Sequence, residues 1–101
     1  MNTIYVAVTH HYWGRGLTEE EALAEMAKAG GKRKRGEKTA VYRITYPDFV
    51  EDEDGTRLKD ETTGEDIPTA KPYVDEMGYV CHHGTSEPVA TFIGKVRVGL
   101  R

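Results

Sequence analysis

Apolar and polar side chains alternate along two stretches of the first half of the chain, and each stretch predicts a β-strand. The first runs from Thr3 to His11, and the second runs from Thr39 to Tyr46, where Pro47 ends the pattern. The first strand is expected to be half-buried, because alternation sends one set of side chains to a core and the other to solvent. Its apolar face carries three branched residues: Ile4, Val6 and Val8.

One helix is marked at both ends between these strands. Thr18 is a favourable N-cap residue, and Glu21 three positions later completes a capping box. The helix is expected to run from about Glu19 to Ala29, and Gly30 or Gly31 is expected to supply the left-handed residue that follows it. Its apolar face has small side chains at helical spacing, so the helix is expected to lie close to the sheet.

The second half of the chain has weaker patterns. Residues 48–72 are acidic and irregular, with turn signals at Asp54-Gly55 and Thr63-Gly64. This segment is predicted to be a mobile loop or a small hairpin.

Two further strands are predicted after it. Tyr73 to His83 predicts a third strand with an interruption at Gly78, and Val89 to Leu100 predicts a fourth strand. The inward face of the fourth strand is expected to comprise Ala90, Phe92, Gly94, Val96, Val98 and Leu100.

These elements predict a single α+β domain, in which one helix packs on a face of a mostly antiparallel sheet of about four strands. The length of 101 residues fits one domain. No run approaches the roughly 20 apolar residues of a membrane span, and no secretory signal pattern is visible. The single Cys81 excludes an internal disulfide and fits a reducing compartment. We therefore expect a cytoplasmic protein without membrane contact.

Charge is distributed unevenly along the chain, although the net charge is only −3. Residues 28–38 hold six basic side chains and one acidic side chain, a local charge of +5, whereas residues 48–66 hold nine acids and two bases, a local charge of −7. Such asymmetry bears on partners rather than on fold.

The acidic stretch predicts a surface that occupies the basic groove of a protein partner, imitating the spacing of phosphates. Its candidate binding residues are Glu51, Asp52, Glu53, Asp54, Asp60 and Glu61. A calcium-binding EF-hand is disfavoured, because aligning Gly55 with the invariant glycine of such a loop puts Val50 at the first ligand position.

The basic stretch predicts an alternative function, in which the protein binds nucleic acid through its phosphates. The residues that would carry it are Lys32, Arg33, Lys34, Arg35 and Lys38. The aromatic residues that usually accompany such cations in single-strand binders are missing from this loop.

Histidine occurs only as two pairs, and each pair ends a predicted strand. His10, His82 and the neighbouring Cys81 are weak metal-ligand candidates, because adjacent strand residues point to opposite faces and no regular ligand spacing appears. A small metal or nucleotide ligand around the histidines and Trp13 is a third alternative, but no cofactor is expected. No nucleophile has a recognisable base and orienting group, so the chain is not expected to be an enzyme.

The loop before the predicted helix carries residue types that dominate interaction hot spots, namely Tyr12, Trp13 and Arg15. They predict either a contact patch or, for Trp13, a lid over the start of the helix. The loop lacks the Lys-Ser/Thr of a P-loop and the third glycine of a dinucleotide-binding loop.

The segment Trp13-Gly-Arg-Gly-Leu-Thr-Glu-Glu-Glu-Ala22 resembles a loop–helix segment of many small uncharacterised bacterial and phage proteins. The resemblance implies a structural role and brings no catalytic residues. In size, single-domain organisation and acidic surface, the chain is also similar to phage-encoded inhibitors of host defence, including anti-CRISPR proteins. That likeness implies an inhibitor of a nucleic-acid-handling host complex that acts by contact.

Overall fold

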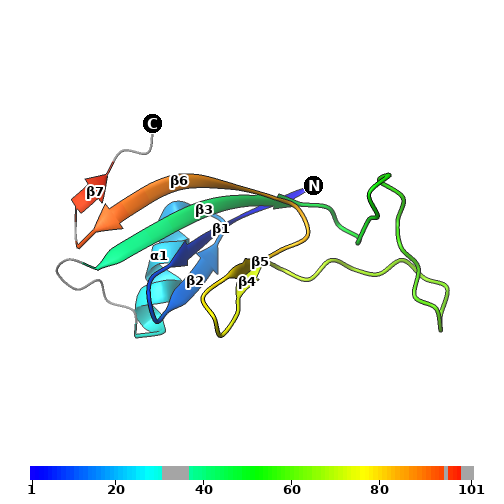
Figure 1. Cartoon of the computed structure of the whole chain (residues 1–101), viewed down its shortest axis with the longest axis horizontal. Helices are drawn as coiled ribbons and strands as arrows, with labels where there is room; N and C mark the ends of the chain where they lie inside the picture. Colours follow the sequence, from blue (N-terminus) through cyan, green and yellow to red (C-terminus); the bar gives the residue numbers. More distant parts are fainter. Residues whose placement is uncertain (31–36, 95, 99–101) are drawn as a thin grey trace.

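The computed structural model describes residues 1–30, 37–94 and 96–98, and it shows an α+β fold built on an antiparallel sheet (Figure 1). The main sheet has five strands rather than about four, in the order β2-β1-β3-β6-β7. Its strands are β1 (Asn2–Val8), β2 (Trp13–Gly16), β3 (Lys38–Tyr46), β6 (Thr85–Ile93) and β7 (Val96–Val98). A small hairpin of β4 (Tyr73–Val74) and β5 (Val80–Cys81) forms a second sheet, and the helix among these residues is α1 (Glu19–Lys28).

The predicted helix is confirmed at both ends. The side chain of Thr18 accepts a hydrogen bond from the backbone N–H of Glu21 at 3.1 Å, and the Glu21 carboxylate accepts one from the N–H of Leu17 at 2.8 Å. After the C-cap at Ala29, Gly30 adopts a φ of 97°, in the left-handed region that favours glycine. The capping pattern in the sequence therefore identified both ends of the helix.

The predicted loop before the helix is wrong, because Trp13–Gly16 forms the edge strand β2. Gly14 and Gly16 face α1, where a Cβ on Gly14 would lie 2.2 Å from the backbone nitrogen of Met26. A Cβ on Gly16 would lie 2.4 Å from the Cβ of Glu21. Glycine at every second position thus lets the helix approach the strand closely, and it also hides the alternation that identifies a strand.

Both faces of the sheet are covered, so the first strand is not half-buried as predicted. The core beneath the helix consists of Ala7, Ala22, Met26, Val41, Val89, Ala90 and Phe92. On the opposite face the buried residues are Ile4, Val6, Ile44 and Tyr46. Val74 and Val80 of the β4–β5 hairpin pack against this second core together with Trp13.

The strands predicted after residue 72 are only partly correct. Tyr73 to His83 is not one strand but the β4–β5 hairpin, which reverses at Gly78 with a φ of 87°. The predicted fourth strand begins earlier, at Thr85, and it reverses at Gly94, so β7 returns along β6. Val96 is consequently 68% exposed and Val98 is exposed as well, which corrects their predicted inward position; Leu100 lies outside the described residues.

Residues 48–69, which we call the acidic arm, extend away from the end of the sheet (Figure 1). The molecule measures 50 × 28 × 21 Å, with a radius of gyration of 15.4 Å. A compact chain of 101 residues would have a radius of gyration of about 13 Å. The arm therefore makes the molecule elongated. No helix in the described part of the chain is long and apolar enough to cross a membrane.

Candidate functional site

The acidic arm is held at both of its ends. Asn2 donates from Nδ2 to Oδ1 of Asp48 at 2.6 Å, and the N–H of Thr69 donates to the carbonyl of Asp48 at 3.0 Å. Just beyond the arm, Pro72 is fully buried, and its carbonyl accepts a hydrogen bond from Nη1 of Arg15 at 2.9 Å. The arm therefore leaves the body of the protein at a fixed place.

Three backbone segments inside the arm are joined by a closed ring of hydrogen bonds. The N–H of Val50 donates to the carbonyl of Ile67 at 2.9 Å, and the N–H of Ile67 donates to the carbonyl of Leu58 at 3.3 Å. The N–H of Leu58 donates in turn to the carbonyl of Val50 at 2.9 Å. Two short hairpins thus branch from one stem, and isolated bridges extend the pairing on each branch.

An aspartate side chain closes the turn of each hairpin. Oδ1 of Asp52 accepts the N–H groups of Asp54 and Thr56 at 2.9 and 3.0 Å. Oδ1 of Asp60 accepts those of Thr62 and Thr63 at 2.8 and 3.1 Å. These are side-chain-to-backbone bonds that favour turns over extended chain. Asp52 and Asp60 are therefore needed to shape the arm.

Both basic side chains of the arm are directed to a single acid. Arg57 and Lys59 both pair with Asp66, and the Arg57–Asp66 distance is 3.0 Å. Hydrogen bonding from Lys59, and then from Arg57, holds the pKa of Asp66 below its ordinary value of 3.8. The Arg57 guanidinium also lies 4.6 Å from the ring centroid of Phe49. The arm's own cations are thus occupied inside the arm.

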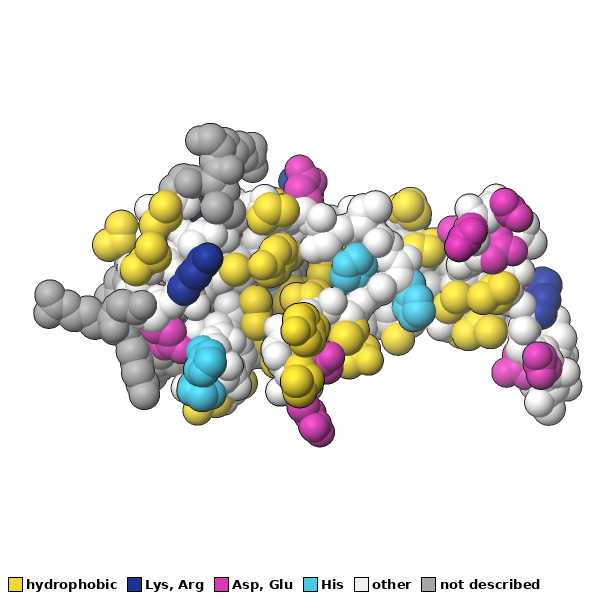
Figure 2. All heavy atoms as spheres, viewed as in Figure 1, with side chains coloured by type: hydrophobic (Ala, Val, Ile, Leu, Met, Phe, Trp, Pro, Cys, Tyr) yellow, Lys and Arg dark blue, Asp and Glu magenta, His cyan; other side chains and the backbone are white. Residues whose placement is uncertain are grey.

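Several other carboxylates of the arm are left without partners. Glu51, Glu53, Asp54 and Glu61 are exposed, and their side chains make no hydrogen bond or ion pair within the described residues. Acidic side chains accordingly gather at the far end of the molecule in Figure 2. The six acidic residues singled out in the sequence therefore all lie on the two hairpins of the arm, and four of them have unpaired carboxylates.

The basic alternative can be placed only in part. Lys32, Arg33, Lys34 and Arg35 lie outside the described residues. Lys38 is exposed at the start of β3, whereas the arm follows Tyr46 at the other end of that strand. Eight strand steps separate Lys38 from Tyr46, or about 26 Å. Lys38 and the acidic arm are therefore at opposite ends of the sheet.

The hot-spot candidates beside the helix are largely occupied by contacts within the chain. The half-buried ring of Trp13 packs on the second core rather than over the start of the helix, and the Arg15 guanidinium lies 5.5 Å from its centroid. Arg15 also holds Pro72, as described above. Tyr12 is exposed and lies beside Gly30.

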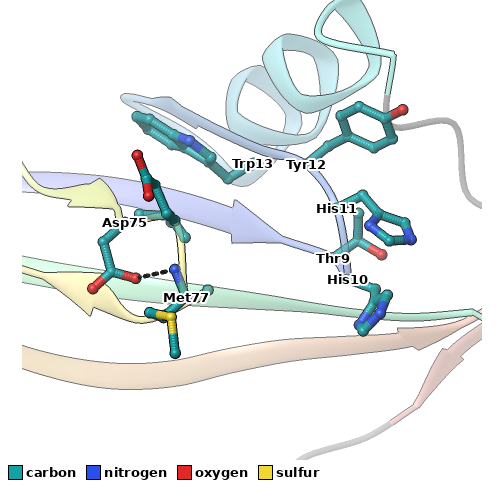
Figure 3. Close-up of a pocket in the computed structure, with 10 residues that line it drawn as sticks. Thr9, His10, His11, Tyr12, Trp13, Asp75 and Met77 are labelled. Atoms are coloured by element: carbon teal, nitrogen blue, oxygen red, sulfur yellow. Dashed lines mark hydrogen bonds between the residues drawn. The ribbon is translucent and has the colours of Figure 1, made fainter.

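The two histidine pairs lie in different places. His10 and His11 form the turn between β1 and β2 and line a cavity of about 400 Å³ that also involves Trp13 and residues 74–78 (Figure 3). His82 and Cys81 line a separate cavity of about 340 Å³. Among the described residues, no three side chains of His, Cys, Asp or Glu are grouped to hold a metal ion.

The Cys81 thiol lies beside oxygen atoms of its own hairpin. Its sulfur is 3.7 Å from Oδ2 of Asp75 and 3.7 Å from the carbonyl of Tyr79. A hydrogen bond with Cys81 is the main cause that raises the pKa of Tyr73. Nδ1 of His82 accepts the N–H of Gly84 at 3.1 Å, so this nitrogen bonds to the backbone.

Three residues that organise the arm were not predicted from the sequence, namely Arg57, Lys59 and Asp66. Arg57 and Lys59 are two positions apart, as side chains on one face of a strand are. Their shared acid could not be identified, because its position depends on how the three segments of the arm meet.

Comparison with known proteins adds no relative: no family model, no curated protein and no solved structure matches this chain.

Proposed function

We propose that this protein is a small cytoplasmic, non-catalytic binding protein whose acidic arm occupies a basic groove of a protein partner. The partner would be a nucleic-acid-handling complex, inhibited because carboxylates occupy its phosphate-binding positions, as the resemblance to phage-encoded inhibitors implies. The observation that carries the proposal is the pairing of both Arg57 and Lys59 with Asp66. Because these are the only two cations of the arm, the unpaired charges that remain on it are all negative.

The construction of the arm supports this use. Hydrogen bonds at the stem, in the ring and at each turn fix the backbone before a partner binds, which lowers the ordering cost of association. Four consecutive acids at positions 51–54 present negative charge at close intervals, and a nucleic acid strand carries one charge about every 3.4 Å. Such a surface also accelerates encounter with a basic groove.

The proposal is tested by paired charge reversals. Glu53→Lys with Asp54→Lys changes the arm without touching Asp52, whose side chain holds the turn. Glu20→Lys with Glu25→Lys makes the same charge change on the exposed face of the helix. Each protein is used to capture partners from a nuclease-treated bacterial lysate. The captured partner is then released and bound to a labelled DNA oligonucleotide, and displacement of this oligonucleotide by free wild-type protein is measured.

We expect the arm variant to lose the partner, the helix variant to keep it, and the wild-type protein to displace the oligonucleotide. Equal capture by both variants contradicts the proposal. Direct binding of the oligonucleotide by this protein, weakening steeply with salt, would instead favour the basic residues Lys32–Arg35 with Lys38.

A further inference from the structure

Strand β2 forms one edge of the main sheet, where it pairs with β1 alone (Figure 1). The ladder between them starts at the turn, where the N–H of Thr9 donates to the carbonyl of Tyr12 at 2.8 Å. In an antiparallel ladder every second residue is hydrogen-bonded to the neighbouring strand. Gly14 and Gly16, which lie opposite β1 residues at this spacing, therefore direct their N–H and C=O groups toward β1.

The alternate residues of β2 direct their backbone groups away from the sheet. These residues are Trp13 and Arg15, and neither backbone is hydrogen-bonded to another element in the described part of the chain. The open edge ends at Leu17, because the Glu21 carboxylate accepts the N–H of that residue. Two N–H donors and two C=O acceptors are thus available to a further strand.

A groove of about 710 Å³ runs along this edge, between β2 and the outer side of α1. Residues 13–15 line it on one side, and Glu21, Ala24 and Lys28 are among the helix residues on the other. Gly14 places no side chain in it, and the only charged side chain of β2, that of Arg15, bonds instead to the Pro72 carbonyl. The groove therefore lacks the charged side chains or prolines that usually protect a sheet edge.

We propose that an extended segment of a protein partner binds in this groove and adds a sixth strand to the sheet, antiparallel to β2. An extended chain presents backbone donors and acceptors at every second residue, which is the spacing of Trp13 and Arg15. Main-chain hydrogen bonds then supply affinity, and the side chains that face the groove supply specificity. This binding site is on the body of the protein and is independent of the acidic arm.

The charges in the groove indicate which segment fits. Opposite Gly16 the added strand meets Glu21, whose Oε2 accepts the Leu17 N–H, while its Oε1 makes no hydrogen bond within the described residues. A lysine at this position complements the carboxylate. The other end offers no unpaired charge, because Lys28 pairs with Glu25 at 3.1 Å.

Opposite Gly14 the added strand meets the backbone of α1 and the small, exposed side chain of Ala24. A branched apolar side chain fills this space, because Gly14 contributes no side chain of its own. A second copy of this chain, paired symmetrically through its own β2, would bring another Gly14 to this position and leave the groove empty. The partner segment therefore reads Lys-x-Val or Lys-x-Ile from its N-terminal side.

The probe is the peptide acetyl-Thr-Lys-Thr-Val-Thr-amide, titrated into the ¹⁵N-labelled full chain and followed by nuclear magnetic resonance. In the free protein the amide hydrogens of Trp13 and Arg15 should exchange at least tenfold faster than those of Gly14 and Gly16, which bond to β1. Saturating peptide should shift the signals of β2 and slow the exchange of Trp13 and Arg15 at least tenfold.

Two methylated peptides test the pairing on the wild-type protein. N-methylation of the central threonine removes the N–H that donates to the Arg15 carbonyl, and it should weaken binding at least tenfold. N-methylation of the valine removes an N–H that points away from β2, so binding should be kept. Replacing the peptide's lysine by glutamate should also weaken binding about tenfold, because it opposes Glu21.

Matched variants of the chain complete the test. Arg15→Pro removes the outward N–H of β2, which an edge strand tolerates, whereas Arg15→Ala removes only the side chain. The proline variant should bind the peptide at least tenfold more weakly than the alanine variant does. Glu53→Lys with Asp54→Lys should bind it as the wild-type protein does, whatever that change does to partner capture, so the groove and the arm can fail separately.

Three results would overturn the proposal. The first is the absence of saturable shifts in β2, and the second is equal binding of the two methylated peptides. The third is protection of the Trp13 and Arg15 amides that grows with protein concentration in the absence of peptide, because a second copy would then cover the edge.

Discussion

Gly14 shows how much one residue decides in this molecule. A Cβ at this position would lie 2.2 Å from the backbone nitrogen of Met26 and 2.6 Å from the carbonyl oxygen of Ala22. Backbone atoms cannot step aside as the end of a flexible side chain can, so the helix must move away from β2. Gly14→Ala should lower the free energy of unfolding by about 3 kcal/mol, the upper part of the usual range for overpacking. Urea unfolding followed by circular dichroism measures this loss.

The control for that substitution is Gly55→Ala. Gly55 also has a conformation that favours glycine, with a φ of 84°, but no other atom lies within 4 Å of the Cβ it would gain. Its turn belongs to the acidic arm, which contributes no residue to either core. The unfolding midpoint of the body should therefore stay as in wild type, and an equal loss in both variants would show that close packing is not what Gly14 provides.

Residues whose role depends on near neighbours were predictable from the sequence. Thr18 and Glu21 were assigned correctly, and Gly30 was one of the two glycines predicted to follow the helix, because capping involves positions three or four apart. Gly14 was misread, because its role depends on a helix eight to twelve residues away in the chain. Asp66 gave no signal at all, since its two cations reach it only after the arm has folded.

At the scale of elements, the acidic arm is stabilised by Asp66 in a way that depends on pH. Its pKa is lowered in the folded arm, so the stabilisation is complete above the ordinary value of 3.8 and is lost as pH falls through the lower, folded value. We expect the contact between Arg57 and the Phe49 ring to persist at mildly acidic pH and to disappear below that window. Nuclear Overhauser contacts between the two side chains, followed across an acid titration, measure this.

Asp66→Asn is the matched variant for the titration. It keeps the shape of the side chain but removes the charge that both cations share, so the Arg57–Phe49 contact should be weakened at every pH. A contact that survives in wild type at the most acidic pH at which the body stays folded would exclude Asp66 as the organiser of the arm.

The predictability of an element depended on where its pattern was interrupted. Lys38–Tyr46 was predicted to within one residue, because proline ends its alternation directly. The stretch after residue 84 was misdivided, because branched and aromatic residues continue to alternate through the reversal at Gly94. Both turn signals of the acidic arm coincide with hairpin turns. The ring of backbone hydrogen bonds that joins the two hairpins involves Val50, Leu58 and Ile67, and no local sequence pattern specifies their pairing.

The whole molecule is elongated because its most acidic segment does not pack on the body. The two cores are built from the five-stranded sheet, the helix and the β4–β5 hairpin. The arm is closed at its base by the bond from Thr69 N–H to the Asp48 carbonyl. Body and arm therefore meet at a narrow stem, so the arm can be removed without cutting into either core. The charge and composition of residues 48–69 do not show where this stem lies.

This architecture predicts what removal of the arm does. Replacing residues 49–68 by two glycines should leave the core intact, because the ends to be joined already lie at hydrogen-bond distance. The thermal midpoint should remain close to that of the full chain, while the radius of gyration from small-angle X-ray scattering should fall from near 15.4 Å to about 12 Å, the value for a compact chain of that length. A full chain that already scatters as a compact particle would mean that the arm folds back on the body. The carboxylates of the arm would then be unavailable to a basic groove, and the proposed mode of binding would fail with the predicted shape.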